Sequence, residues 1–195
     1  MKHISILASG NGTNAENIIR YFSNDKNAQV TLVLSNKPQA KVLERAAALG
    51  VDAFFFDRAQ FYETGEVLMM LRRRETDLVV LAGFLWLVPE DVIDAFRGRI
   101  INIHPALLPG FGGRGMYGDR VHRAVLDAGC SESGITIHYV NEHYDSGDII
   151  FQAKCPVLPG DDVNSLASRV HELEYVHYPR VIENLVEGTN QAIRQ

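Results

Sequence analysis

HISILASGNGTNAENIIRYF, residues 3–22, shows the organisation of the whole chain. An apolar run at 3–8 is followed by a glycine-rich turn and then by a helical pattern at 15–22. This order predicts a buried strand, a tight loop and a helix. Because the same unit recurs along the first half of the chain, we expect a parallel sheet covered by helices.

The further strands expected in the first half are rich in Val, Ile, Leu or Phe and span 30–34, 53–56, 78–82 and 100–103. The helices expected there span 40–49, 60–75 and 89–96. In the second half, apolar and polar residues alternate at 135–139, which predicts a half-exposed strand, and 148–157 is expected to return beside it. Helices are expected at 119–128 and 164–186, and Pro179 should end or kink the second.

We therefore predict a single α/β domain over residues 1–195. Its Rossmann-like sheet should be mainly parallel, flanked by helices, with at least one antiparallel strand in the second half. The net charge of -5, from 19 basic and 24 acidic residues, gives no general attraction toward nucleic acid or anionic membranes.

Targeting signals and cysteine usage give a second set of expectations. Cys130 and Cys155 lack CxxC or metal-finger spacing, which is typical of a reducing compartment. The sequence shows neither the pattern of a signal peptide nor an apolar run of membrane-spanning length. A cytoplasmic protein that binds neither nucleic acid nor membrane is expected.

The loop Gly10-Asn11-Gly12-Thr13-Asn14-Ala15 lies between the first strand and the first helix, where backbone amides and the helix dipole favour a phosphate. It also fits GxGxxA, but a dinucleotide site needs an acidic residue about 20 positions on. The second strand instead ends Ser35-Asn36-Lys37. This end has no acidic residue for NAD, and only the 2'-phosphate of NADP could find a partner there, in Lys37. The alternative is a tight turn in which Thr13 or Asn14 caps the helix.

The run Arg99-Ile100-Ile101-Asn102-Ile103-His104-Pro105 ends a strand, so alternation places Asn102 and His104 on one face. A carboxamide and a protonated imidazole there suit acyl transfer, since both donate to the oxygen of a tetrahedral intermediate. The alternative is a polar pair satisfied within the core.

A carboxylate near His104 would help to hold a proton on the imidazole. Asp145 lies 145 − 104 = 41 residues further on, where the two later strands should turn. Asp148 is the nearest rival, and both acids could simply serve the turn. The sequence leaves this choice open.

Five segments in the same order resemble one family. They are strand-GNGTN-helix, LAGF at 81–84, NIHPALLP at 102–109, GITIH at 134–138 and DSGDIIFQAKCPV at 145–157. Together they resemble the phosphoribosylglycinamide formyltransferases, a folate-dependent formyltransferase family, over nearly the whole chain. The resemblance implies transfer of a formyl group from 10-formyltetrahydrofolate, as co-substrate, to glycinamide ribonucleotide in purine biosynthesis, without a metal and by a monomer or weak homodimer.

By position, the resemblance assigns a role to each candidate residue. Asn102, His104 and Asp145 become the catalytic trio, with Asp145 raising the pKa of His104. The residues implied to bind the ribonucleotide are Gly12, Thr13, Asn14 and Glu174. Those implied to bind folate are Leu85, Trp86, Leu87, Val88 and Asn102, with Arg58 toward the glutamate tail.

Two features depart from the family pattern. Better-known members often carry arginine at the position of Trp86, so ring stacking on the pterin is expected in place of a polar contact. The loop at 110–118 is several residues longer here and introduces Arg114, Met116, Tyr117 and, just beyond it, Arg120. Its five glycines favour a lid over the site.

Several other functions share parts of this pattern. A formyltetrahydrofolate hydrolase or a sugar-nucleotide formyltransferase would use the same trio, whereas a methionyl-tRNA formyltransferase should bring a further C-terminal domain and a basic face. The hydrolase should bring an N-terminal regulatory domain. An NADP-binding oxidoreductase or a nonenzymatic nucleotide-binding module are more distant alternatives. A metal hydrolase is disfavoured because the histidines show no HExxH or similar spacing.

Overall fold

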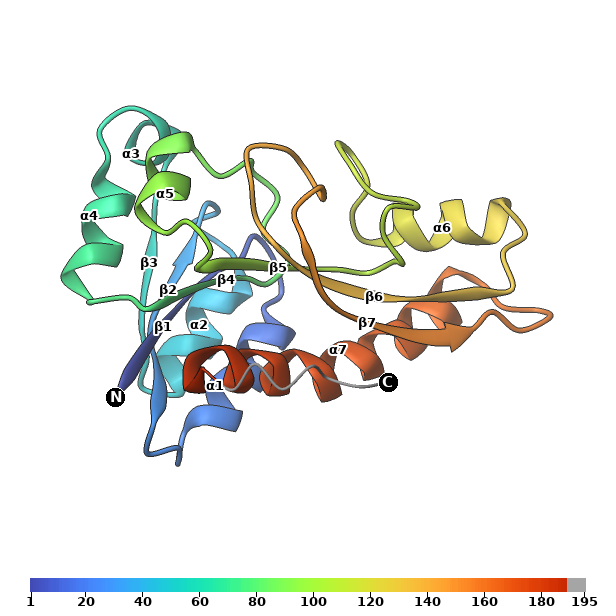
Figure 1. The fold of residues 1–195 in the computed structure, drawn as a ribbon, viewed down its shortest axis with the longest axis horizontal. Coiled ribbons are helices and arrows are strands. Elements are labelled where there is room, and N and C mark those ends of the chain that lie inside the picture. Colours follow the sequence, from blue (N-terminus) through green and yellow to red (C-terminus); the bar gives the residue numbers. More distant parts are fainter. Residues whose placement is uncertain (189–195) are drawn as a thin grey trace.

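A computed structural model of the protein describes residues 1–188 (Figure 1). Its strands are β1 (Lys2–Leu7), β2 (Ala28–Ser35), β3 (Asp52–Phe55), β4 (Leu78–Leu81), β5 (Ile100–His104), β6 (Glu132–Tyr139) and β7 (Ile149–Pro156). Its helices are α1 (Thr13–Phe22), α2 (Lys41–Ala48), α3 (Arg58–Tyr62), α4 (Glu66–Arg73), α5 (Glu90–Ala95), α6 (Asp119–Asp127) and α7 (Val163–Glu187).

The strands form one sheet in the order β3-β2-β1-β4-β5-β6-β7. The pairs among the first five strands are parallel, whereas β6 runs antiparallel to both β5 and β7. Helices lie on both faces of the sheet (Figure 1). The expected α/β class, the mainly parallel sheet and the antiparallel strand in the second half are confirmed.

Residues of β1, β2, β4 and β5 enter two separate cores, one on each face of the sheet. One core packs against α1, α2 and α7, and it takes Ile101 and Ile103 from β5. The other packs against α3, α4 and α5 and takes Ile100, but neither Asn102 nor His104 belongs to it. The helices of this second core therefore cover β1 to β4, and loops cover the β5 and β6 end of the same face.

The single helix expected at 60–75 is wrong, because two short helices, α3 and α4, share this segment. Asp57 starts α3 with a capping box in which its side chain accepts a hydrogen bond from the Gln60 N–H. The break falls before Gly65, whose left-handed φ of 69° precedes α4 and suits glycine.

The expected end of the helix at Pro179 is wrong, since α7 runs through this residue from Val163 to Glu187. Proline removes the N–H that would bond the carbonyl four residues earlier, which is that of Tyr175. This carbonyl instead accepts a 2.9 Å hydrogen bond from the Asn17 side chain of α1. A tertiary contact thus replaces the hydrogen bond that the helix lacks.

The expectation of a half-exposed strand at 135–139 is wrong, because Thr136 and His138 are buried. The segment that follows β5 folds over this face. The Thr136 hydroxyl donates to the Ala106 carbonyl at 2.7 Å and accepts from the Leu108 N–H at 2.9 Å. The polar residues of β6 are therefore covered by a loop.

Candidate active site

A cavity of about 560 Å³ opens at the carboxyl ends of β1, β4 and β5, as expected for an open parallel sheet. The loop after β5, the 140–147 turn, α6 and α7 complete its walls. The cavity lining includes eight of the residues expected at the site, namely Gly12, Thr13, Asn14, Leu85, Asn102, His104, Asp145 and Glu174.

Asn102 and His104 lie on the same face of β5, next to Thr136 and His138 of β6. Asn102 Nδ2 lies 3.2 Å from His138 Nε2, and His138 Nδ1 lies 2.8 Å from the Tyr139 carbonyl. Both contacts are within hydrogen-bond distance, so the His138 ring lies between the Asn102 carboxamide and a backbone carbonyl. His138 therefore orients the carboxamide of Asn102 and occupies one of its two N–H donors.

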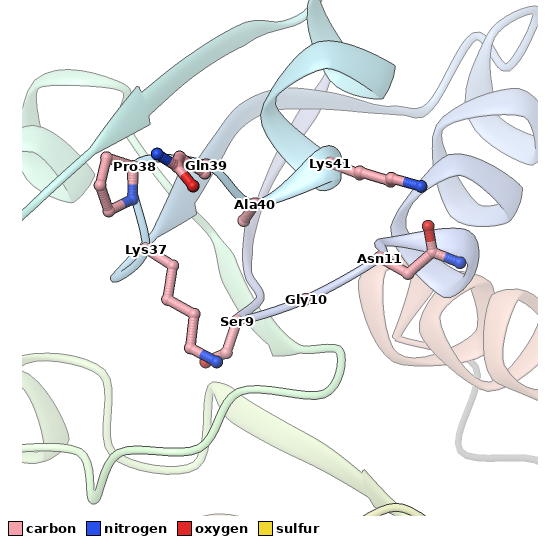
Figure 2. Close-up of a pocket in the computed structure, with 8 residues that line it drawn as sticks. All are labelled: Ser9, Gly10, Asn11, Lys37, Pro38, Gln39, Ala40 and Lys41. Carbon is pink, nitrogen blue, oxygen red and sulfur yellow. The ribbon is translucent and has the colours of Figure 1, made fainter.

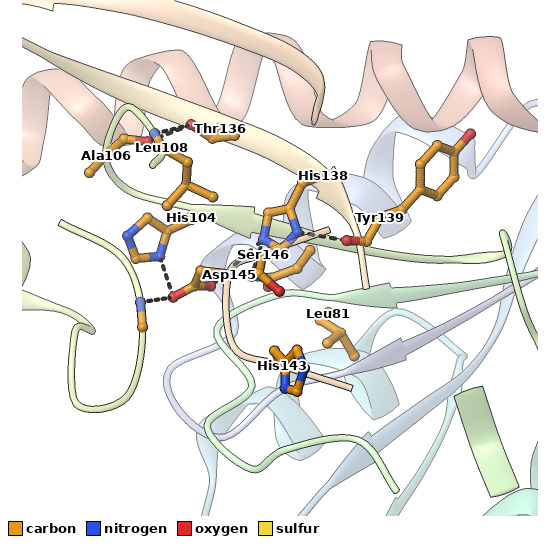
Figure 3. Close-up of polar contacts among 12 residues, drawn as sticks. Leu81, His104, Ala106, Leu108, Thr136, His138, Tyr139, His143, Asp145 and Ser146 are labelled. Carbon is orange, nitrogen blue, oxygen red and sulfur yellow. Dashed lines mark hydrogen bonds and ion pairs between the residues drawn. The ribbon is translucent and has the colours of Figure 1, made fainter. Parts of the chain in front are cut away.

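Asp145 faces both imidazoles (Figure 3). Its Oδ2 lies 3.5 Å from His104 Nδ1 and accepts a 2.9 Å hydrogen bond from the Gly113 N–H, while its Oδ1 lies 3.7 Å from His138 Nε2. Burial acts to raise the pKa of the Asp145 carboxyl, but His138, the charge of His104 and the Gly113 N–H together hold it below the usual value. Asp145 is thus an anion opposite His104.

The structure also distinguishes the two candidate acids. Asp145 adopts a left-handed φ of 51° and points inward, whereas the side chain of Asp148 is exposed. Asp148 contributes its carbonyl, which accepts a 2.9 Å hydrogen bond from the Tyr139 N–H. Of the two, only Asp145 contacts His104.

The second nitrogen of His104, Nε2, lies 2.8 Å from the carbonyl of Phe111 and donates to it. Phe111 has a left-handed φ of 55°, which a non-glycine residue rarely adopts. The same 110–118 loop lines the cavity from Gly113 to Gly118. In this conformation the loop therefore occupies the His104 donor that acyl transfer would need.

The glycine loop is held close to α2 and α7. Gly12 has a left-handed φ of 77°, and a Cβ built there would lie 2.4 Å from the Cβ of Val42. Asn14 Nδ2 donates to Glu174 Oε2 at 2.8 Å, and Glu174 is only 4% exposed. The alternative in which Thr13 or Asn14 caps α1 is wrong, because Gly12 is the N-cap and no side chain caps it.

The four residues at 85–88 that are implied to bind folate have different surroundings in the structure. Leu85 lines the cavity, whereas Val88 is buried in the second core and Leu87 accepts a 2.8 Å hydrogen bond from the Tyr62 hydroxyl through its carbonyl. Trp86 packs against the rings of Tyr62 and of two phenylalanines. The Arg58 guanidinium lies 4.7 Å from the Tyr62 ring centroid and 5.9 Å from that of Trp86.

Arg58 and Trp86 are therefore neighbours, as the resemblance implies for residues of one subsite. Neither of them lines the cavity, and nor do Leu87 and Val88. Their assignment to folate stays a prediction.

A second cavity lies beside Gly10 and Asn11, the first two residues of the glycine loop (Figure 2). Lys37 and Lys41 line it together with Ser9, Pro38 and Gln39, and its lining contains no acidic residue. The carboxylate that would bind the ribose hydroxyls of a dinucleotide is thus missing from this position.

Two further observations concern metals and membranes. Within residues 1–188, no group of three or more His, Cys, Asp or Glu side chains is arranged to hold a metal ion. In the same range, none of the helices is both long and apolar enough for a membrane span.

Comparison with known proteins adds independent evidence. A family model described as formyl transferase matches residues 2–182. The chain belongs to the formyl transferase family. Among its curated relatives in this formyl transferase family is the phosphoribosylglycinamide formyltransferase of Bacillus subtilis, which is 37% identical over 98% of both chains.

Two plant relatives, the chloroplastic phosphoribosylglycinamide formyltransferases of Arabidopsis thaliana and Vigna unguiculata, are each 39% identical over 95% of this chain. The chain spans 66% and 61% of their respective lengths. A crystal structure of glycinamide ribonucleotide transformylase 1 from Symbiobacterium toebii matches with a TM-score of 0.88 at 38% identity, covering 96% of this chain and 89% of that one.

Two groups of the candidate site were not predicted from the sequence. His138 was only one of the polar residues in an alternating strand, and its position opposite Asn102 depends on the β5–β6 register. The alternation was the available signal, because it puts His138 and Thr136 on one face. The Phe111 carbonyl had no signal, since a backbone group is not encoded by residue type.

Proposed function

We propose that this formyl transferase moves a formyl group from 10-formyltetrahydrofolate to the amine of glycinamide ribonucleotide, a step of purine biosynthesis. The observation that carries the proposal is a single cavity lined both by Asn102, His104 and Asp145 and by the hydrogen-bonded pair Asn14 and Glu174. The names of the relatives support the choice of acceptor.

The amine attacks the formyl carbon, and negative charge then builds on the formyl oxygen. Asn102 Nδ2 has a second N–H that His138 does not use, and it is available to this oxygen. A protonated His104 supplies a second and stronger donor, with the Asp145 carboxylate as its counter-charge. One such oxyanion donor is typically worth about a hundredfold to a thousandfold in turnover.

In this mechanism the 110–118 loop must move. Because the Phe111 carbonyl accepts from His104 Nε2, that donor becomes available only when the carbonyl withdraws. Gly113 and Gly115, with φ values of 96° and 90°, provide the backbone freedom for such a change. We therefore propose that the 110–118 loop acts as the lid that its glycine-rich sequence predicts.

At the ribonucleotide end, the backbone N–H groups of the loop at Gly12 and Thr13 are proposed to bind the phosphate at the start of α1. The carboxylate of Glu174, oriented by Asn14, would accept hydrogen bonds from the glycinamide or ribose. Leu85 to Val88 and Arg58 are proposed to bind the folate. The free thiols Cys130 and Cys155 fit the cytoplasmic location that we infer.

The experiment that tests the proposal offers 10-formyltetrahydrofolate to the purified protein with glycinamide ribonucleotide, a sugar nucleotide or water alone. Mass spectrometry of the acceptor and absorbance of the folate follow both substrates. We expect formylated glycinamide ribonucleotide as the product. Deformylation without an acceptor would indicate a formyltetrahydrofolate hydrolase instead. A formylated sugar nucleotide would indicate a sugar-nucleotide formyltransferase.

A further inference from the structure

Helix α6 directs one histidine, His122, into the cavity wall, and the mechanism above does not use it. The residue is only 2% exposed. Its Nδ1 is buried and, among residues 1–188, has no hydrogen-bond partner. A buried polar atom without a partner is destabilising, so an apolar side chain would serve this position better if packing were its only role.

His122 lies on the buried side of α6, beside Val121 and one turn before Val125. Both valines are part of the buried apolar interior, so the pattern of the helix calls for an apolar residue at 122 as well. The imidazole instead borders a cavity that also contains His104 and Glu174. It is therefore positioned to contact a ligand.

The charged and titratable groups that act on His122 come from three elements. They are Asp119 on α6 itself, His171 and Glu174 on α7, and His104 on β5. Burial, followed by the charges of His171 and His104, lowers the pKa of His122 below 6.5, although Glu174 and Asp119 act in the opposite direction. His122 is thus neutral at neutral pH and offers a lone pair.

A neutral acceptor in this cavity meets a specific chemical need. The attacking nitrogen must lose one proton, and His104 cannot take it while it serves as a cationic donor to the oxyanion. Glu174 already accepts from Asn14 Nδ2 and lies 2.8 Å from His171 Nδ1. The imidazole of His122 lies on the same cavity wall and its Nδ1 has no hydrogen-bond partner among residues 1–188, so this ring can accept the proton.

Building on the proposed function, we propose that His122 accepts the proton that the glycinamide amine loses as it attacks the formyl carbon. The C–N bond forms while the carbonyl electron pair moves onto oxygen. The bond from the formyl carbon to the folate nitrogen then breaks, and that nitrogen takes a proton from His104. The reaction leaves His122 protonated and His104 neutral, and exchange with solvent restores both.

The test compares His122→Gln with the wild-type enzyme, using His177→Gln as the matched control. His177 lies on α7, packs on the Phe151 ring at 4.8 Å and does not line the cavity. We expect His122→Gln to lower kcat by about a hundredfold, the lower end of general acid–base contributions. The KM for glycinamide ribonucleotide should change by less than about threefold, because the glutamine keeps a polar contact.

The pH profile separates proton acceptance from a structural role. In the wild type, kcat should rise with pH through the lowered pKa of His122, on the acid side of 6.5. His122→Gln should lose this acid limb, and His177→Gln should keep it. A His122→Gln enzyme with wild-type kcat and an intact acid limb would overturn the inference.

A second measurement does not depend on the stability of the variant. The imidazole resonances of His122 in the wild-type enzyme should shift on addition of glycinamide ribonucleotide, and unchanged resonances at saturation would contradict the inference. The proposed function is judged separately, by whether the wild type formylates this acceptor. If it does and His122→Gln is as active, only the role of His122 fails.

Discussion

The two faces of the β5–β6 pair are built from alternate residues of the same strands but are buried in different ways. The face under α7 carries isoleucines, namely Ile101, Ile103, Ile135 and Ile137. The opposite face carries Asn102, His104, Thr136 and His138 and is covered by loops.

On the apolar face, burial is stabilising in proportion to area and depends little on which neighbour is touched. On the polar face each group needs a specific partner, because an unpaired polar group costs more than a pair contributes. Substitutions on the apolar face should therefore change stability, whereas those on the polar face should change activity or loop arrangement.

The largest effect is expected for Asn102→Ala and His104→Ala. Each removes one proposed oxyanion donor and should lower turnover by about a hundredfold or more. Steady-state kinetics measures this, with His143→Ala as a control because the side chain of His143 is exposed in the adjacent turn. Unchanged turnover in both variants would overturn the site assignment.

A smaller effect is expected for Thr136→Val. The substitution keeps the shape of the side chain but removes the hydroxyl that bonds the Ala106 carbonyl and the Leu108 N–H. Unfolding in urea should show a loss of about 1–3 kcal/mol, the cost of leaving buried groups unpaired. Thr136→Ser retains the hydroxyl and should recover most of that loss; if Ser and Val variants are equally destabilised, the hydrogen bonds are not the cause.

A still smaller effect is expected for Ile137→Val on the apolar face. Loss of one buried methylene should cost about 0.5–1.5 kcal/mol in unfolding free energy. Turnover of the folded enzyme should stay at the wild-type value, since the side chain faces α7. A fall in turnover similar to that of Asn102→Ala would show that the two faces are not separable.

The smallest effect at neutral pH concerns the titration of Asp145. Its pKa in the folded protein lies below the ordinary value of 3.8, so its contribution to stability is complete above pH 3.8 and is lost as the pH falls through the folded pKa. Urea titrations should show the wild type losing stability relative to Asp145→Asn only in that acid range. Asp148→Asn serves as the control, and parallel curves for wild type and Asp145→Asn would contradict the prediction.

Features set by local sequence could be predicted. Runs of Val, Ile and Leu identified the buried strands, and alternation correctly put Asn102 and His104 on one face. The glycine loop could be recognised from its glycines. At Gly12 the structure needs glycine, because the φ is 77° and the backbone lies close to Val42.

Features set by distant contacts could not be predicted. The carbonyl of Tyr175 that Pro179 leaves without its helical partner is bonded by Asn17, which lies 158 residues away in the sequence. The choice of Asp145 over Asp148 depends on a turn conformation and on the Gly113 N–H. The break before Gly65 did have a local signal, which the helical periodicity around it obscured.

The most direct test of the account is a crystal structure with glycinamide ribonucleotide and an unreactive analogue of 10-formyltetrahydrofolate. We predict that the oxygen equivalent to the formyl oxygen lies about 2.7–3.1 Å from Asn102 Nδ2 and from a ring nitrogen of His104, with the Phe111 carbonyl displaced. An analogue whose oxygen contacts neither residue, or that lies in the cavity lined by Lys37 and Lys41, would contradict it.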